Sequence, residues 1–255
     1  MADKSPPEGS FDFDMVTQLS EKDAEYVATW MAEAFSKTDC LPYIATGKTF
    51  ADDPHAHYLW FRSLLDRTAG AGYLVVNKTR TAMRVMFPPG KKDERLDMSY
   101  VTPHDENWKL FLERCSGAEA VKARISPLRA RIAESLKTVY GEDAGLSHFR
   151  TAGFAVHPGC QGQGLGAAMH SYIANTAKRA DKKWHFTAVE RVVSRSPSTA
   201  LALTPTDITA TKLPYYGRLG CKIVGEKIPT GIDEVGRQAY PPGNDFKWLC
   251  EVSPA

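Results

Sequence analysis

The chain contains 255 residues, 43% of them hydrophobic, and its formal net charge at pH 7 is +2. This composition can bury the core of one large domain, while the small charge and the lack of a long basic tract argue against a nucleic-acid partner. No segment reaches the ~18 apolar residues of a membrane span and the N-terminus lacks an apolar signal region, so we predict a cytoplasmic protein with no membrane partner.

Hydrophobic periodicity predicts the elements of the N-terminal half. After a disordered tail at 1–10, residues 11–19 alternate in apolar character and predict a strand. Ser20 is typical of a helix N-cap, and the apolar stripe that follows continues to Phe35. Asp53 and Pro54 predict the start of a second helix, because proline is tolerated in a first turn.

The middle of the chain reads as a hairpin followed by a helical insertion. Residues 72–77 and 81–87 are apolar runs joined by a short polar turn, which predicts two paired strands. Between 88 and 145 the pattern becomes charged and helical, with helices expected near 107–115 and 127–139. Residues 91–95 carry charges of mixed sign and predict a solvated surface.

The C-terminal part contains strands and helices in alternation. Residues 184–197 fit no single pattern. The other elements are predicted as a strand at 148–156, a helix at 164–182, a strand at 201–204, a helix at 212–219, a strand at 220–224 and a strand at 245–252.

The most informative segment is a glycine loop between a strand and a helix. The strand stops at Pro158, and Gln161 is followed by glycines at 162, 164 and 166. Backbone N–H groups that enter a helix, with the positive end of its dipole behind them, bind phosphate oxygens. The spacing Gly162-x-Gly164-x-x-Ala167 also fits a dinucleotide fingerprint, but Asp181 lies in a basic helix end and not at the end of a strand.

The string Val-x-Pro-x-x-Gln-x-x-Gly-x-Gly, from Val156 to Gly166, resembles the acetyl-CoA signature of the GNAT N-acetyltransferase superfamily. The run from Leu213 to Gly220 resembles the Leu-Pro-aromatic-Tyr-x-Arg-Leu-Gly segment of puromycin N-acetyltransferase-like members. The resemblance implies an α/β (α+β) GNAT fold: a single domain over 11–255 with a central mixed, bent sheet flanked by helices. The helical insertion, at about 88–145, then lies between the third and fourth strands.

The same resemblance implies an acetyl-CoA-dependent N-acetyltransferase. Acetyl-CoA is the implied cosubstrate, and the acetyl group passes to the amine of a small molecule by direct attack in a ternary complex, in a detoxification or resistance role. Two alternatives stay open: a non-catalytic acyl-CoA-binding GNAT domain, and an acetyltransferase acting on a peptide or protein amine. The five cysteines have no metal-ligand spacing, so we predict reduced thiols and no metal. A monomer or homodimer is expected.

By resemblance, most of the cofactor-binding residues belong to the glycine-loop segment. The set is Phe154, Ala155, Val156, Gln161, Gly162, Gln163, Gly164, Leu165, Gly166, Ala167 and Lys212. Lys212 stands where many members carry an asparagine, and Cys221 replaces an aromatic residue.

Tyr216 corresponds to the tyrosine that acts as general acid beside the CoA sulfur in many members. A phenol with a pKa near 10 is protonated at neutral pH and can protonate a thiolate. The general base stays open. Arg150 occupies the position of the usual glutamate, which leaves a water chain, His148 or Glu190 as alternatives.

The acceptor is expected between the first two helices and the insertion, on the face opposite the CoA arm. Aromatic and acidic side chains in these segments could hold a cationic, partly apolar amine. The candidate residues are Phe35, Asp39, Tyr43 and Trp108.

Overall fold

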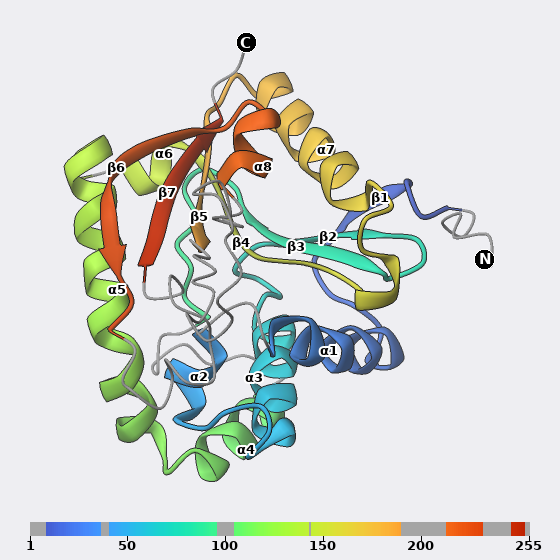
Figure 1. The fold of residues 1–255 in the computed structure, drawn as a ribbon, viewed down its shortest axis with the longest axis vertical. Helices are drawn as coiled ribbons and strands as arrows, with labels where there is room; N and C mark the ends of the chain where they lie inside the picture. The colour runs from blue at the N-terminus through green and yellow to red at the C-terminus, as the bar shows by residue number, and fades with distance from the viewer. Residues whose placement is uncertain are drawn as a thin grey trace, which may run out of the picture.

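The computed structural model describes residues 9–36, 41–95, 105–142, 144–189, 213–231 and 246–252. Its centre is one mixed sheet of seven strands in the order β1-β2-β3-β4-β5-β7-β6 (Figure 1). The strands are β1 (Phe13–Val16), β2 (Tyr73–Asn77), β3 (Ala82–Phe87), β4 (Phe149–Val156), β5 (Trp184–Val189), β6 (Lys222–Pro229) and β7 (Phe246–Val252). Neighbouring strands are antiparallel except β4 and β5, which are parallel.

Helices cover both faces of this sheet. They are α1 (Glu21–Phe35), α2 (Leu41–Thr46), α3 (Pro54–Asp66), α4 (Glu106–Arg114), α5 (Ala118–Tyr140), α6 (Ala144–Ser147), α7 (Leu165–Arg179) and α8 (Leu213–Arg218). One core cluster joins α1, α3 and α4 to the sheet, and a second joins α7 and α8 to its opposite face. Figure 1 shows α7 on one side of β3 and β4, with α1 and α3 on the other. The expected mixed sheet flanked by helices is confirmed.

Local capping explains where the first long helices begin. The Ser20 hydroxyl accepts a hydrogen bond from the Asp23 N–H at 3.2 Å and caps α1. The Asp53 carboxylate accepts one from the Ala56 N–H at 3.0 Å and caps α3, whose first residue is Pro54. Both helix starts follow the sequence signals, because each cap satisfies an N–H group that the helix itself leaves unpaired.

The Asp53 cap is also held by two cations, which makes it a test of stability. Burial alone raises the pKa of Asp53, but the hydrogen bonds from Lys48 and Arg114 outweigh it and bring this pKa to about 2. We expect Asp53→Ala to lower the free energy of unfolding by about 1–2 kcal/mol, the value of a lost N-cap, in urea titrations. Because the folded pKa is depressed, this contribution is present above pH ~4 and is lost as the pH falls toward 2.

The control for this prediction is Glu33→Ala, at an exposed position of α1. Its expected effect is within about 0.5 kcal/mol. Equal losses in the two variants, or an Asp53→Ala loss that does not shrink in acid, would contradict the assignment of the cap.

The helical insertion lies between β3 and β4, as expected, but its long helix is different from the prediction. α5 begins at Ala118, directly after Gly117, and not at Pro127, which lies inside the helix. Proline removes one backbone hydrogen bond and is normally read as a helix start or break. Here Val121, Ile125 and Leu128 are buried along one side of α5, so the packing of this face maintains a continuous helix through the proline.

Most of the remaining boundaries agree with the sequence to within about three residues, but β6 continues to Pro229, beyond the predicted end at 224, and the short helices α2 and α6 were not predicted. The first strand is shorter than expected, because its pairing with β2 ends at Val16, and the undecided 184–197 segment begins with β5. The predicted strand at 201–204 and most of the tail at 1–10 lie outside the described residues, as do Asp39, Glu190 and Lys212. Within the described part, no helix combines the length and apolar character needed to cross a membrane.

Candidate functional site

The site begins where β4 and β5 separate. Their parallel pairing joins Phe149–Thr151 to Trp184–Phe186, whereas β4 continues to Val156. Beyond Thr151 the side of β4 that faces β5 has no strand pairing in the described part of the chain. Backbone groups there are available to bind a ligand in the manner of an added strand.

A bulge in β4 lies at the same place. Two steps along β3, from Met83 to Val85, correspond to three steps along β4, from Ala155 to Ala152. Gly153 takes a φ of +58°, a left-handed conformation that glycine adopts without strain. Such a bulge redirects the side chains that follow it, and here the following side chain is Phe154.

The glycine loop has the conformation that its sequence predicts. Gly162 and Gly164 have φ angles of +80° and +85°, and a Cβ added at either would have no described neighbour within 4 Å. The first helical hydrogen bond of α7 runs from the Ala168 N–H to the Gly164 carbonyl at 3.0 Å. Within the described structure, the N–H groups of residues 165–167 therefore have no backbone partner and lie at the positive end of the helix dipole.

The end of β4 and the glycine loop enclose a cavity of about 540 Å³, here called the cofactor cavity. Nine of the predicted cofactor residues line it: Phe154, Ala155, Val156, Gln161, Gly162, Gly164, Leu165, Gly166 and Ala167. Gln163 does not line it, and its amide instead donates to the Gly159 carbonyl at 3.4 Å. The Gln161 amide donates to the Val156 carbonyl at 3.1 Å and ties the loop to the strand.

The third glycine of the loop is needed for packing inside the protein. A Cβ at Gly166 would lie 2.9 Å from the Tyr215 hydroxyl and 3.2 Å from the Phe154 ring. A larger residue at this position would therefore displace two side chains of the cavity wall, so Gly166 is a poor place to test contact with a ligand.

A second cavity has a volume of about 280 Å³ and is called the acceptor cavity here, after the acceptor site that the sequence leads us to expect. Its apolar wall comes mainly from α3 and α5 and includes Trp60, Phe61, Ile125 and Leu128. Three residues line both cavities: Phe35, Phe154 and Tyr216. The two cavities therefore meet at one junction, formed by the end of α1, the bulge of β4 and α8.

Tyr216 is almost completely buried at this junction. Its ring lies 4.8 Å from that of Phe186, centroid to centroid. Burial raises the pKa of Tyr216 to about 12, although the nearby Arg84 guanidinium acts in the opposite direction. The phenol is therefore protonated at neutral pH and can donate a proton or a hydrogen bond.

The acceptor cavity also has a charged wall, which begins with Arg84 on β3. Arg84 is 2% exposed, and its Nε and Nη1 atoms have no hydrogen-bond partner among the described residues. Its guanidinium lies 4.5–4.9 Å from the ring centroids of Phe154, Trp184 and Phe186. Burial lowers the pKa of Arg84. An unpaired buried ion costs several kcal/mol, and each cation–π contact returns about 0.5–2 kcal/mol.

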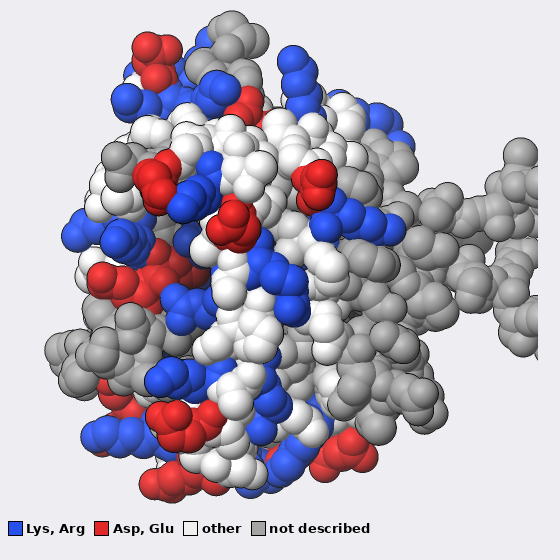
Figure 2. All heavy atoms as spheres, turned by 90° about the vertical axis from the view of Figure 1, so that its left-hand side faces the viewer, with Lys and Arg blue, Asp and Glu red and all other residues white. Residues whose placement is uncertain are grey.

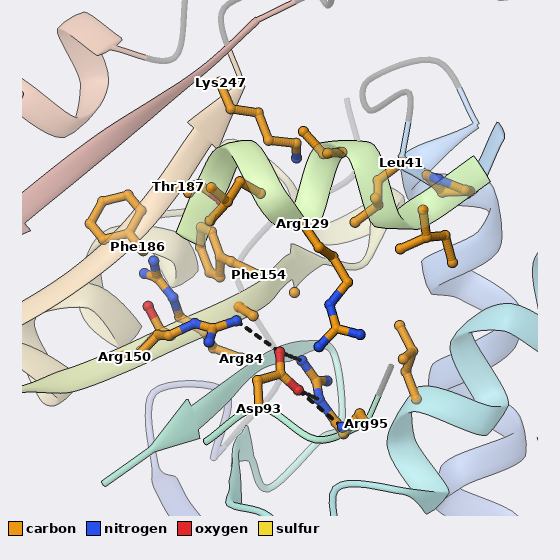
Figure 3. A pocket seen from close by; sticks show the side chains of 18 of the residues that line it. Leu41, Arg84, Asp93, Arg95, Arg129, Arg150, Phe154, Phe186, Thr187 and Lys247 are labelled. Carbon is orange, nitrogen blue, oxygen red and sulfur yellow. Dashed lines mark hydrogen bonds and ion pairs between the residues drawn. The ribbon is translucent and has the colours of Figure 1, made fainter. Parts of the chain in front are cut away.

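A second part of the charged wall surrounds Asp93. Arg95 donates two hydrogen bonds to this carboxylate at 2.9 and 3.0 Å, and Arg150 donates one at 2.9 Å. Figure 3 shows these side chains converging, with Arg129 reaching toward them from α5. Burial alone raises the pKa of Asp93, but the guanidiniums of Arg95 and Arg150 outweigh it and hold this pKa far below its usual range. The side chains of Asp93 and Arg95 are thus buried, and the sequence expectation of a solvated surface is wrong for them.

Comparisons with known proteins agree with this architecture. No protein-family model and no curated protein matches the sequence. Among solved structures, a histone acetyltransferase HPA2 and related acetyltransferase from Corynebacterium glutamicum is 14% identical; the match covers 95% of this chain and 97% of that chain, with a TM-score of 0.50. The chain has a GNAT fold. Two further structures also match. Drosophila melanogaster polyamine N-acetyltransferase is 13% identical, and the match covers 95% of this chain and 100% of that chain with a TM-score of 0.47. Aedes aegypti arylalkylamine N-acetyltransferase 2 is 12% identical, and the match covers 96% of this chain and 100% of that chain with a TM-score of 0.46.

Of the expected acceptor residues, Tyr43 and Trp108 do not line the junction, whereas Phe35 does. Tyr43 is in a small core cluster with Ile44, Leu128 and Ile228. Trp108 stacks on Phe111 at 5.3 Å, with the Arg67 guanidinium 4.6 Å from its ring centroid. Neither residue lines the acceptor cavity described above. Phe35 lines it and stacks on Phe61 at 5.1 Å.

The base candidate His148 and the thiol of Cys221 both lack the position or the chemistry for catalysis at the junction. His148 packs against Tyr140 at 4.9 Å and lines neither cavity, which places it away from Tyr216. The Cys221 thiol lies 3.5 Å from His170, and burial raises the pKa of Cys221 to about 12, so it is not a thiolate nucleophile. Among the described residues, no group of three or more His, Cys, Asp or Glu side chains could hold a metal ion.

Proposed function

We propose that the protein is an acetyl-CoA-dependent N-acetyltransferase that acts on a small amine by direct attack in a ternary complex. The observation that carries this proposal is the junction of two cavities at Phe35, Phe154 and Tyr216. One cavity has features suited to a pyrophosphate and an extended arm, and the other has room for a separate acceptor. The narrower resemblance to puromycin N-acetyltransferase-like proteins belongs to the same proposal and is carried by the sequence alone.

The residues of the cofactor cavity fit acetyl-CoA. The N–H groups of residues 165–167 and the open space at Gly162 and Gly164 suit phosphate oxygens. The unpaired side of β4 suits the amides of a pantetheine arm. When bound, acetyl-CoA supplies an acetyl thioester. Cys160 lines the cofactor cavity, but it does not line the acceptor cavity or belong to the three residues of the junction. This position favours direct transfer over a first transfer to the cysteine.

Tyr216 has the position and protonation state of a general acid. Its hydroxyl keeps a proton at neutral pH because the pKa is about 12, and it can pass this proton to the thiolate that leaves. Asp93 is the carboxylate of the described acceptor wall, but a carboxyl with so low a pKa is a weak base. We therefore propose that water entering the cavity takes the amine proton and passes it to bulk solvent.

The experiment that tests the proposal is calorimetry with the full chain, followed by a screen of amines. We expect CoA and acetyl-CoA to bind with micromolar dissociation constants and NAD to bind at least tenfold more weakly, because the loop lacks the acidic ribose partner of a dinucleotide site. Release of CoA thiol with an amine panel then distinguishes an enzyme from a non-catalytic acyl-CoA-binding domain. Folded protein that binds no CoA would rule out the proposal.

A peptide or protein amine is the second candidate acceptor. The structure favours a small molecule, since the acceptor cavity is bounded on one side by the packed helices α3 and α5. Including peptides with free N-termini in the same panel tests this preference.

A further inference from the structure

The acceptor cavity carries an unusual excess of positive charge. Among the described residues that line it, five side chains are cationic and one is a carboxylate. The cationic residues are Arg84, Arg95, Arg129, Arg150 and Lys247, and the carboxylate is Asp93. Arg84 and Lys247 are buried, at 2% and 5% exposure, so water screens their charges less than it would at the surface.

This excess is a property of the cavity and not of the outer surface nearby. Figure 2 shows acidic and basic side chains interspersed over the face of the molecule that carries α5. Inside the cavity, Asp93 is held by Arg95 and Arg150 and also interacts electrostatically with Arg129, so one carboxylate faces three of the five cations. Figure 3 shows Lys247 approaching from the side opposite Asp93.

Arg84 is the most informative of these cations. Three aromatic rings surround its guanidinium, and its Nε and Nη1 atoms have no hydrogen-bond partner within the described structure. Rings satisfy the charge in part but accept no conventional hydrogen bond, so N–H donors of a buried cation remain for a ligand. Arg84 itself and two of these rings, Phe154 and Phe186, line the acceptor cavity, which places the Arg84 side chain beside the junction with the cofactor cavity.

Opposite this charge lies the apolar wall formed by Trp60, Phe61, Ile125 and Leu128. An acceptor with a second positive charge would be repelled by the arginines. An acceptor with an anion would receive charge-assisted hydrogen bonds and place its apolar part on the other wall. Resting on the proposed function, we propose that the acceptor is a small amine that carries an anionic group, a carboxylate or a phosphate, beside an apolar body, and that Arg84 binds this anion.

The positive charge of the cavity also affects how the acceptor amine loses its proton without a carboxylate base. Nearby cationic side chains disfavour an ammonium ion and lower the pKa of the acceptor amine. A larger fraction of the bound amine is then neutral and able to attack. The site thus depends less on a carboxylate at the position of Arg150.

The test compares acceptors that differ only in the anion. kcat/KM is measured for a panel of apolar amino acids, their amides and their decarboxylated amines, for example phenylalanine, phenylalaninamide and 2-phenylethylamine. Ethanolamine phosphate against ethanolamine forms the phosphate arm. We expect the anionic members of one arm to be preferred about ten- to a hundredfold, the range of a hydrogen bond to a charged group. A preference within the amino-acid series identifies the bound anion as a carboxylate, and a preference within the ethanolamine pair identifies it as a phosphate.

Variants locate the anion. Arg84→Met keeps the length of the side chain and removes its charge, and Arg129→Gln is a second variant in case the first does not fold. In Arg84→Met, the ratio of kcat/KM for the anionic acceptor to kcat/KM for its counterpart without the anion should fall close to one. The KM for acetyl-CoA should stay unchanged. Its Tm should equal or exceed that of the wild type, because the variant removes a buried charge. Lys122→Gln, at an exposed position of the same helix as Arg129, is the control and should keep the preference.

A binding measurement separates this inference from the proposed function. Calorimetry of N-acetylphenylalanine against N-acetyl-2-phenylethylamine, and of N-acetylethanolamine phosphate against N-acetylethanolamine, needs no turnover. Tighter, Arg84-dependent binding of an anionic member without thiol release would keep the anion site and reject the enzyme. Thiol release that favours neutral or cationic amines, or equal binding within both pairs, would overturn the anion site and keep the enzyme.

Discussion

Replacing Tyr216 by phenylalanine is expected to lower kcat about ten- to a hundredfold and to leave the KM for acetyl-CoA nearly unchanged. The hydroxyl matters only while charge develops on the leaving sulfur, so its loss affects the transition state and not ground-state binding. General-acid assistance is typically worth about 10²–10⁴-fold, and a thiolate leaves without help more readily than an alkoxide, which reduces the expected factor. The ring contact with Phe186 at 4.8 Å is kept in the variant.

The matched control is Tyr215→Phe, on the same helix. The Tyr215 hydroxyl lies beside Gly166, and its ring lines the cofactor cavity alone. We expect its kcat to stay within about threefold of the wild-type value. Measurements from pH 6 to 9, under conditions where chemistry limits turnover, decide the role of Tyr216. Wild-type kcat in Tyr216→Phe over this range would remove the residue from the mechanism and leave the cofactor cavity intact.

Local signals predicted those parts of the fold that depend on neighbouring residues. Ser20 and Asp53 begin helices because each side chain caps an N–H group three residues later. Gly162 and Gly164 take positive φ angles, which is also a local property, because glycine has no Cβ that disfavours this conformation. The start of α5 was predicted wrongly at Pro127, because the packing of the buried side of α5 overrides the tendency of proline to begin or break a helix. β5 is held by pairing with β4 and β7, which are distant in the sequence. The local sequence of 184–197 therefore did not reveal a strand.

The cofactor cavity could be predicted from the sequence, whereas the charged acceptor wall could not. Nine cofactor residues lie in one short segment with a recognisable spacing. The wall combines Arg84, Asp93, Arg129 and Lys247, which come from distant elements and meet only in the folded chain. One signal was present: Arg84 is a lone charge in the apolar run 81–87. A charge at the centre of a predicted buried strand is costly unless it has a function or a partner.

Replacing Gly164 by valine is expected to raise the KM for acetyl-CoA tenfold or more. No described protein atom lies within 4 Å of the position that a Cβ would take at Gly164, and this space opens into the cofactor cavity. A bulky side chain there would keep phosphate oxygens away from the N–H groups of residues 165–167. Loss of one or two charge-assisted hydrogen bonds, at about 1.5–3 kcal/mol each, gives the expected factor.

Backbone strain at Gly164 has to be separated from this effect, and the chain offers a control with the same sign of φ. Gly141, at the end of α5, has a φ of +84° and equally open surroundings, but it lies outside both cavities. Valine is strained at both glycines, and more so at Gly141, whose ψ of −177° is almost exclusive to glycine, than at Gly164, whose ψ is −6°. Gly141→Val should therefore lose at least as much stability as Gly164→Val in urea titrations. Only Gly164→Val should lose affinity for CoA in calorimetry. If Gly141→Val weakens CoA binding as much, or if Gly164→Val binds CoA like the wild type, the pyrophosphate does not bind at this loop.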